Sequence, residues 1–200
     1  MAHVRTAVVT RSIELHDLEV VVGRRVLAGP LSLVHTPGTI LWILGENGAG
    51  KSSLLRVLAR RAKHRGRLVL SPPPDDLRSI AYYAPVMRFP TGITVADWLT
   101  LHRRQQPDDG VEGVAALLPE NAHGAVNKLS TGEAKRLQLW ALLRTSRPYY
   151  FLDEPFEHLS PAGKQSLKHI LARHARESVV VIATNQDVPS DVPANVLELA

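Results

Sequence analysis

Residues 45–53 read Gly-Glu-Asn-Gly-Ala-Gly-Lys-Ser-Ser, and they lie between two apolar segments at 39–44 and 54–59. A strand, a glycine-rich turn and a helix start in this order form the setting in which a phosphate-binding loop works. The glycines let the backbone N–H groups point inward, where side chains would block an approaching phosphate. The alternative is a loop that only turns the chain, but the full pattern Gly-x-x-x-x-Gly-Lys-Ser favours a nucleoside triphosphate site.

This phosphate loop contains both a cation and a hydroxyl group. Lys51 is expected to reach the β- and γ-phosphates, and the Ser52 hydroxyl is expected to ligate Mg²⁺. We predict that the whole loop binds the nucleotide, namely Gly45, Glu46, Asn47, Gly48, Ala49, Gly50, Lys51, Ser52 and Ser53.

Two adjacent carboxylates follow an apolar run in the second half of the chain. Residues 149–152 are Tyr-Tyr-Phe-Leu, and Asp153 and Glu154 come directly after them. A buried parallel strand that ends in this way presents side chains at its C-terminal edge. Asp153 would then hold the metal together with Ser52, and Glu154 would orient or deprotonate the attacking water. On a surface loop the same pair would usually have no function.

A third segment, the signature segment, reads Leu-Ser-Thr-Gly-Glu at 129–133 and precedes apolar residues at helical spacing. It is also an ordinary helix start, with Ser130 as N-cap and Glu133 completing a capping box. With this segment, the phosphate loop and the acidic strand end in one order, the chain resembles the ATP-binding cassette (ABC) ATPase family over nearly its whole length. The resemblance implies ATP and Mg²⁺ as ligands, and it implies that Ser130, Thr131 and Gly132 contact the γ-phosphate bound to a second copy.

The chain departs from the family's pattern in the signature segment and in the switch position. Thr131 and Glu133 stand where the family usually has glycine and glutamine, and each would weaken closure around the phosphates modestly. Asn185 stands at the catalytic position of a switch histidine. Asparagine can hydrogen-bond a phosphate oxygen, but it cannot carry a proton or a positive charge.

Three further departures concern residues around the nucleotide. The loop at 85–87 lacks the glutamine that the family places near the metal, and Val21 and Val22 are aliphatic where an adenine-stacking aromatic is expected. Ser160 stands at the position of an aspartate. We therefore expect an intact binding apparatus, slow hydrolysis and looser base binding.

The composition is that of one cassette. At 200 residues and 44% hydrophobic, the chain can bury about 70% of its unfolded surface. No apolar stretch reaches the ~20 residues that span a bilayer, the first residues lack the core of a secretory signal, and there is no cysteine. Net charge is +5, and the basic run 60–67 is interpreted as the solvated end of the helix after the phosphate loop, so we expect no nucleic-acid partner.

We predict an α/β fold: a single ABC ATPase-like domain over 1–200, with a P-loop NTPase core built on a parallel sheet. An N-terminal antiparallel β flank would occupy about 1–38, from short β segments at 4–9, 13–22 and 31–34. The core would take about 39–85 and 145–200, and a helical insertion about 86–144, with helices at 95–102, 111–118 and after the signature segment.

The resemblance implies an ATP-binding and ATP-hydrolysing subunit of an ABC membrane transporter, with composite ATP sites between the phosphate loop and the signature segment of paired cassettes. Its partners would be a second cassette, identical or related, and a separately encoded transmembrane subunit, which places the chain on the cytoplasmic face of the cell membrane. Its small size resembles exporter ATPases of the haem-exporter type. The alternative is a regulatory subunit that binds nucleotide with little turnover. A DNA-repair or ribosome-associated ABC ATPase would need a long insertion or two cassettes.

Overall fold

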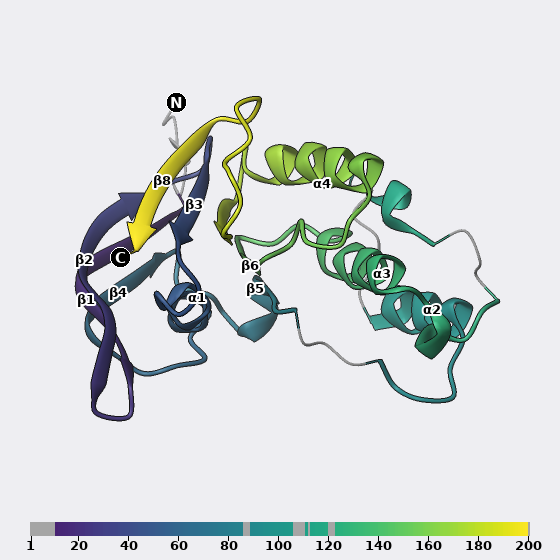
Figure 1. Cartoon of the computed structure of the whole chain (residues 1–200), viewed down its shortest axis with the longest axis horizontal. Coiled ribbons are helices and arrows are strands. Elements are labelled where there is room, and N and C mark those ends of the chain that lie inside the picture. The colour runs from purple at the N-terminus through teal and green to yellow at the C-terminus, as the bar shows by residue number, and fades with distance from the viewer. Residues whose placement is uncertain (1–10, 86–88, 106–110, 112, 120–122, 200) are drawn as a thin grey trace, which may run out of the picture.

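The computed structural model describes residues 11–85, 89–105, 111, 113–119 and 123–199, which form two sheets and several helices (Figure 1). The three-stranded antiparallel sheet has the order β2 (Arg25–His35), β1 (Ser12–Val22), β4 (His64–Ser71). The five-stranded parallel sheet has the order β5 (Ile80–Tyr83), β6 (Tyr149–Asp153), β7 (Val179–Ala183), β3 (Ile40–Gly45), β8 (Ala194–Leu199). The helices are α1 (Lys51–Leu58), α2 (Val95–Gln105), α3 (Thr131–Leu143) and α4 (Pro161–His174).

The parallel sheet is covered on both faces, because its central strands are apolar throughout. Every residue of β6 and of β7 is buried. Successive side chains of β3 enter different cores: Leu41 and Ile43 pack with α1 and the antiparallel sheet, whereas Ile40 and Trp42 pack with α3 and α4. The sheet is thus held between two hydrophobic cores, with α1 on one side and the helical region on the other (Figure 1). The predicted α/β fold is confirmed.

The antiparallel sheet departs from the predicted division at β4. The predicted division places residues 39–85 in the parallel core, but β4 pairs antiparallel with β1. The expected β segment at 4–9 lies outside the described residues, while those at 13–22 and 31–34 fall within β1 and β2. The strand after α1 could pair with either sheet. Which sheet it joins depends on partner strands that are distant in the sequence.

The interpretation of the basic run 60–67 as a helix end is wrong. Helix α1 ends at Leu58, and β4 begins at His64, inside the run. Gly66 has φ +76° within the strand, and a Cβ there would lie 2.2 Å from the Asp17 carbonyl oxygen. The glycine therefore permits close passage past β1.

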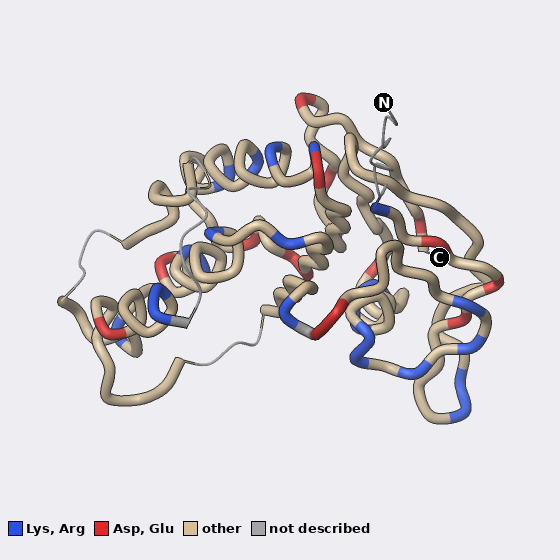
Figure 2. Tube along the Cα trace, turned by 180° about the vertical axis from the view of Figure 1, so that it is seen from behind, with Lys and Arg blue, Asp and Glu red and all other residues tan. Residues whose placement is uncertain are grey.

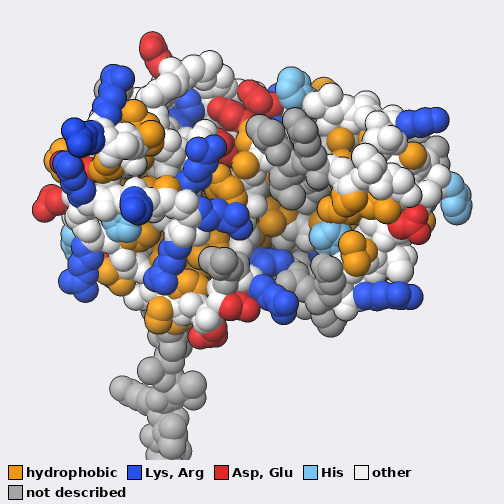
Figure 3. All heavy atoms as spheres, turned by 90° about the horizontal axis from the view of Figure 1, so that it is seen from below, with side chains coloured by type: hydrophobic (Ala, Val, Ile, Leu, Met, Phe, Trp, Pro, Cys, Tyr) orange, Lys and Arg blue, Asp and Glu red, His pale blue; other side chains and the backbone are white. Residues whose placement is uncertain are grey.

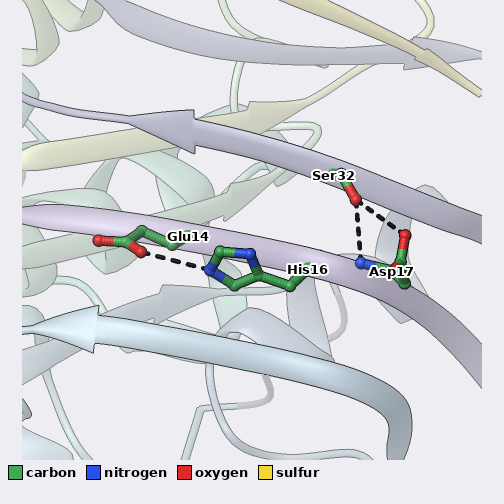
Figure 4. Close-up of polar contacts among 4 residues, drawn as sticks. All are labelled: Glu14, His16, Asp17 and Ser32. Carbon is green, nitrogen blue, oxygen red and sulfur yellow. Dashed lines mark hydrogen bonds and ion pairs between the residues drawn. The ribbon is translucent and has the colours of Figure 1, made fainter.

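A bulge in β1 explains this close passage. The register of β1 shifts between Leu15 and Leu18, and Asp17 has φ 47°. Figure 4 shows how β2 supports the bulge: the Asp17 N–H donates to Ser32 Oγ at 2.9 Å, and Ser32 Oγ donates to Asp17 Oδ1 at 3.2 Å. On the same strand His16 Nε2 lies 3.3 Å from Glu14 Oε2.

The helical region contains α2 and α3 as expected, but the predicted helix at 111–118 is only a 3₁₀ turn, Val114–Leu117. Gly113 before the turn is left-handed, and Leu118 after it is extended because Pro119 follows. Two further 3₁₀ turns are Leu77–Ser79 and Val126–Lys128.

Positive charge gathers over the antiparallel end of the molecule. Figure 2 shows Lys and Arg along the β1–β2 hairpin and the α1–β4 turn, and Figure 3 shows the same concentration from below. Among the described residues, no helix combines the length and the apolar character that a membrane crossing requires.

Candidate nucleotide site

The phosphate loop connects the C-terminal end of β3 to the start of α1. Gly45, Gly48 and Gly50 have φ values of 152°, 94° and 96°, a region that other residues rarely adopt. A Cβ at Gly45 would lie 2.5 Å from the Leu199 carbonyl oxygen of β8, so the loop can leave the sheet here only with glycine. The backbone therefore has the conformation that a phosphate cradle needs, and Glu46, Asn47 and Ala49 complete it.

Lys51 is the first residue of α1, and its side chain folds back over the loop. It is only 6% exposed, and its Nζ donates to the carbonyl oxygens of Gly45 at 2.7 Å and Glu46 at 3.0 Å. The ammonium group is thus held at the loop by the loop's own backbone. Phosphate oxygens that enter the cradle meet a fixed positive charge and the N-terminus of α1.

Ser52 and Asp153 bring two oxygen donors together beside the loop. The Ser52 hydroxyl is hydrogen-bonded to the Asp153 carboxylate, although one lies on α1 and the other ends β6. Burial raises the pKa of Asp153, while the Ser52 hydrogen bond and the charges of Arg56 and Lys51 lower it. A hydroxyl and a carboxylate are ligands that suit Mg²⁺, which takes its other ligands from phosphates and water.

Ser52 and Asp153 are candidate metal ligands in the part of the chain that the structure describes. Among the described residues there is no cluster of three or more His, Asp or Glu side chains that could hold a metal by themselves. A site with one carboxylate and one hydroxyl therefore fits a metal that arrives with the nucleotide. Ser53 follows in the first turn of α1 and is half-buried.

Glu154 leaves the end of β6 in a left-handed conformation, with φ 45°. Its N–H donates to the Ala183 carbonyl oxygen at 2.9 Å, and its Oε2 accepts from Thr184 Oγ1 at 2.8 Å. Burial raises the pKa of Glu154, and the nearby Glu157 charge raises it further. The Thr184 hydrogen bond, an Asn185 backbone hydrogen bond and the Lys51 charge act in the opposite direction. A half-buried carboxylate with a raised pKa is well suited to accept a proton from water.

The sequence reasoning missed Thr184, which orients the Glu154 carboxylate. Its position at the end of an apolar strand, next to the suspected switch residue, is a signal that could have found it. Asn185 follows on the exposed turn after β7. It lines an open cavity of about 610 Å³ together with Gly45, Glu46 and Asn47, which places this residue beside the phosphate loop.

The signature segment forms a capped helix start. Ser130 Oγ donates to Glu133 Oε2 at 2.6 Å, the Ser130 N–H donates to the same oxygen at 2.9 Å, and the Glu133 N–H donates back to Ser130 Oγ at 3.3 Å. The hydrogen bonds from Ser130 lower the pKa of Glu133. A Cβ at Gly132 would lie 2.7 Å from the His158 carbonyl oxygen, so only glycine allows α3 to pack here.

The signature segment and the phosphate loop do not meet within one chain. Ser130, Thr131 and Gly132 line a separate cavity of about 520 Å³ together with Glu133, Arg136, His158 and Ser160. None of these residues lines the cavity at the phosphate loop. Within one chain, the phosphate loop and the signature segment therefore line two separate cavities.

The other positions at which the chain departs from the family's pattern are Ser160, Val22 and the loop at 85–87. Ser160 is the N-cap of α4, and its Oγ accepts from the Gly163 N–H at 3.2 Å. Val22 is 56% exposed on the β1–β2 hairpin, so the hairpin presents an aliphatic surface. Pro85 is exposed, and the positions 86 and 87 of the missing glutamine lie outside the described residues.

Comparison with known proteins identifies the family. A family model described as ABC transporter matches residues 29–157. The cytochrome c biogenesis ATP-binding export protein CcmA 2 of Cupriavidus metallidurans is 33% identical, over 94% of this chain and 95% of its own length. The vitamin B12 import ATP-binding protein BtuD of Citrobacter koseri is 28% identical, over 80% of this chain and 71% of its own length.

Solved structures show the same fold. A putative ABC transporter ATP-binding protein from Pyrococcus furiosus superposes with a TM-score of 0.80 and 21% identity, covering 94% of this chain and 97% of the other. A bacterial Atm1-family ABC exporter with ATP bound gives a TM-score of 0.76 and 22% identity, covering 100% of this chain and 40% of the exporter chain. With a family model over more than half of its length, this chain belongs to the ABC transporter family and corresponds to its ATP-binding subunit.

Proposed function

We propose that this chain hydrolyses ATP in composite sites, each made from the phosphate loop of one copy and the signature segment of another. The observation that carries the proposal is the convergence of Lys51, Ser52, Asp153 and Glu154 at one edge of the parallel sheet. Two of these side chains lie at the start of α1 and two at the end of β6, and these elements meet only in the folded chain. The set contains a phosphate-binding cation, two metal ligands and a base, which together suit phosphoryl transfer to water.

The residues divide the chemistry between them. Lys51 and the loop N–H groups hold the phosphates, and Ser52 and Asp153 would hold Mg²⁺, which supplies positive charge against the phosphate oxygens. Glu154 accepts a proton from the attacking water, in an orientation that Thr184 sets through its 2.8 Å hydrogen bond. The raised pKa of Glu154, which burial causes, makes its carboxylate a better proton acceptor.

The signature segment supplies the second half of each site. Ser130 and Thr131 are exposed at the N-terminus of α3, where the helix dipole and the backbone N–H groups favour an anion. The structure of one chain leaves this anion site without a phosphate loop opposite it. A head-to-tail pair of identical chains satisfies both halves, and a related chain would serve in the same way.

We assign the pair to the cytoplasmic face of a membrane, bound to a separately encoded transmembrane subunit. The relatives support this assignment, because the CcmA 2 and BtuD proteins are described as ATP-binding proteins of export and import. CcmA relatives in several bacteria share about 30% identity with this chain, which favours export of the haem-exporter type.

A regulatory subunit with little turnover is the second candidate, and Asn185 is the observation that favours it. Asn185 lies beside the phosphate loop but cannot become positively charged. Loss of one preorganised donor typically slows chemistry by ~10²–10³. An active subunit would therefore bind ATP tightly and hydrolyse it slowly in isolation.

Steady-state phosphate release at saturating ATP tests the proposal. We expect slow release by the wild type, and a further loss of ~10²–10⁴ for Glu154→Gln, which keeps the shape and removes the base. Glu177→Gln, at an exposed carboxylate before β7, serves as the matched control and should not change the rate. We expect Asn185→His to raise the rate.

The outcomes separate the two candidates. Release that does not depend on Glu154 would contradict the hydrolytic site. No release by the wild type or by Asn185→His, with nucleotide still bound, would favour the regulatory subunit. Brisk wild-type release that Asn185→His reduces would show that asparagine acts as a working substitute for the switch residue.

A further inference from the structure

Lys135 is a buried lysine that the reaction described above does not use. It lies on α3, shortly after the signature segment, and it is only 6% exposed. Its Nζ donates to the carbonyl oxygens of Glu154 at 2.6 Å and Glu157 at 2.9 Å, and it lies 5.8 Å from the centre of the Tyr83 ring. One ammonium group therefore joins α3, the loop at 154–158 that follows β6, and the end of β5.

Burial of Lys135 disfavours its charged form, and nearby carboxylates favour it. Desolvation lowers the pKa of Lys135, whereas the charges of Glu157, Glu154 and Asp153 raise it and that of Lys164 lowers it. An apolar side chain of similar length would fill the same space without a desolvation cost. The charged group has a structural role here, because it donates hydrogen bonds to two backbone carbonyl oxygens of one short loop.

That loop has an unusual backbone. Glu154 and His158 have φ values of 45° and 58°, and neither is glycine. Such conformations persist when the surrounding structure determines them, and they concentrate at functional sites. Lys135 holds the two carbonyl oxygens that lie between these residues. Close packing of Gly132 on the His158 carbonyl group fixes the other end of the loop to the same helix.

We propose that Lys135 is a positioning residue that fixes Glu154 for catalysis and couples it to the signature segment on the same helix. The inference rests on the proposed composite site, in which Ser130 contacts the nucleotide of the second copy. Movement of α3 on that contact is transmitted through Lys135 to the backbone of Glu154. Each chain supplies its signature segment to one composite site, and its phosphate loop and Glu154 to the other. Lys135 therefore couples the nucleotide state of the first site to the catalytic base of the second.

The first test compares Lys135→Met with the wild type in phosphate release and nucleotide titration. Methionine fills the space but donates no hydrogen bond, so we expect kcat to fall about 10- to 100-fold, with nucleotide affinity within about twofold. Lys135→Arg keeps the charge and the donors, and it should recover part of the rate. Lys168→Met is the control, because Lys168 pairs with Asp191 on the molecule's surface, at 2.8 Å, and should leave both quantities unchanged.

A double variant distinguishes positioning from a general loss of structure. If Lys135 acts through Glu154, Lys135→Met should add little to the loss already caused by Glu154→Gln in single-turnover experiments. Additive losses, or an unchanged kcat in Lys135→Met, would overturn the inference. A wild type without phosphate release would instead contradict the proposed hydrolysis.

Hydrogen exchange tests the positioning role without any turnover. In Lys135→Met, the backbone N–H groups of Glu154, Phe156, Glu157 and His158 should exchange at least tenfold faster, including the Glu154 N–H that donates to Ala183. The phosphate loop and β7 should keep wild-type exchange, which also shows that the variant is folded. Unchanged protection of 154–158 would contradict the proposal whatever the hydrolytic rate.

Discussion

The phosphate-loop half-site and the signature half-site are built in different ways. The first collects residues from the ends of β3, β6 and β7, in the middle of a sheet that is covered on both faces, and its Lys51 and Asp153 are buried. The second is the exposed start of one helix, whose serine hydroxyl is engaged by Glu133 of the same turn. Figure 1 shows the first beside α1 and the second in the helical region, at α3.

The difference indicates how each half is prepared for its ligand. Core packing fixes the geometry of the phosphate-loop half-site before nucleotide binds, so changes there should alter affinity or chemistry directly. The signature half-site is ordered only by its own capping box and by packing on the loop after β6. Changes there should alter the association of two chains and leave binding to a single chain intact.

The largest effect is expected from Lys51→Ala, which removes the charge that the phosphate loop holds. Nucleotide affinity should fall about 100-fold, or ~3 kcal/mol, because several anionic oxygens lose a charged donor. A binding titration measures this, with Lys63→Ala in the exposed α1–β4 turn as the control. Equal affinities for the wild type and Lys51→Ala would remove the distinction between the half-sites.

An intermediate effect is expected from Thr184→Val, which removes the hydrogen bond to Glu154 and preserves the shape. That bond lowers the pKa of Glu154 against the effect of burial, so its loss should raise the pKa further. The base works only when deprotonated, so the raised pKa of Glu154 leads us to expect the acid limb of the rate profile above the ordinary value of 4.5. We expect the limb to move to still higher pH. A shift to lower pH would show that Thr184 does not stabilise the carboxylate.

The same pKa shift has a consequence for stability. Because the folded-state pKa of Glu154 is raised, its contribution to stability is fully present below 4.5 and is lost as pH rises through the folded value. Glu154→Gln should therefore melt at a higher temperature than the wild type at neutral pH. Thermal melts at pH 4 and pH 7 check the sign: the advantage should shrink at the lower pH.

The smallest effect is expected from Glu133→Gln in the signature half-site. Glutamine can still complete the capping box, but it removes a negative charge from the place where a γ-phosphate would bind. Association of two chains in the presence of ATP should strengthen by roughly two- to fivefold, while affinity of a single chain is unchanged. Sedimentation of both proteins with ATP measures this. Weaker association would mean that the carboxylate itself is needed at the interface.

The parts of the phosphate-loop half-site could be predicted from the sequence because each of them is local. A glycine-rich turn between a strand and a helix, and two carboxylates after an apolar strand, keep their meaning without knowledge of the fold. Asn185 was likewise placed near the loop by its position after the last apolar strand, and the structure puts it there.

Long-range contacts could not be predicted. The pairing of β4 with β1 depends on a bulge at Asp17 and on Gly66, which are 49 positions apart in the sequence. The contact of Lys135 with the Glu154 and Glu157 carbonyl oxygens depends on how α3 packs on the loop after β6. In the sequence, Lys135 is one of two adjacent basic residues in the helix after the signature segment, and its burial has no local sign.

The central claim is that two chains must meet before either nucleotide site is complete, and the mass of Glu154→Gln in solution tests it most directly. This variant should hold ATP without splitting it, so sedimentation with ATP and Mg²⁺ should show a dimer, and sedimentation without nucleotide should show a monomer. Addition of Thr131→Trp, which places a bulky side chain at an exposed position at the start of α3, should return the ATP-bound protein to a monomer. A Glu154→Gln protein that remains monomeric at saturating ATP, alone and with its transmembrane subunit, would contradict the account.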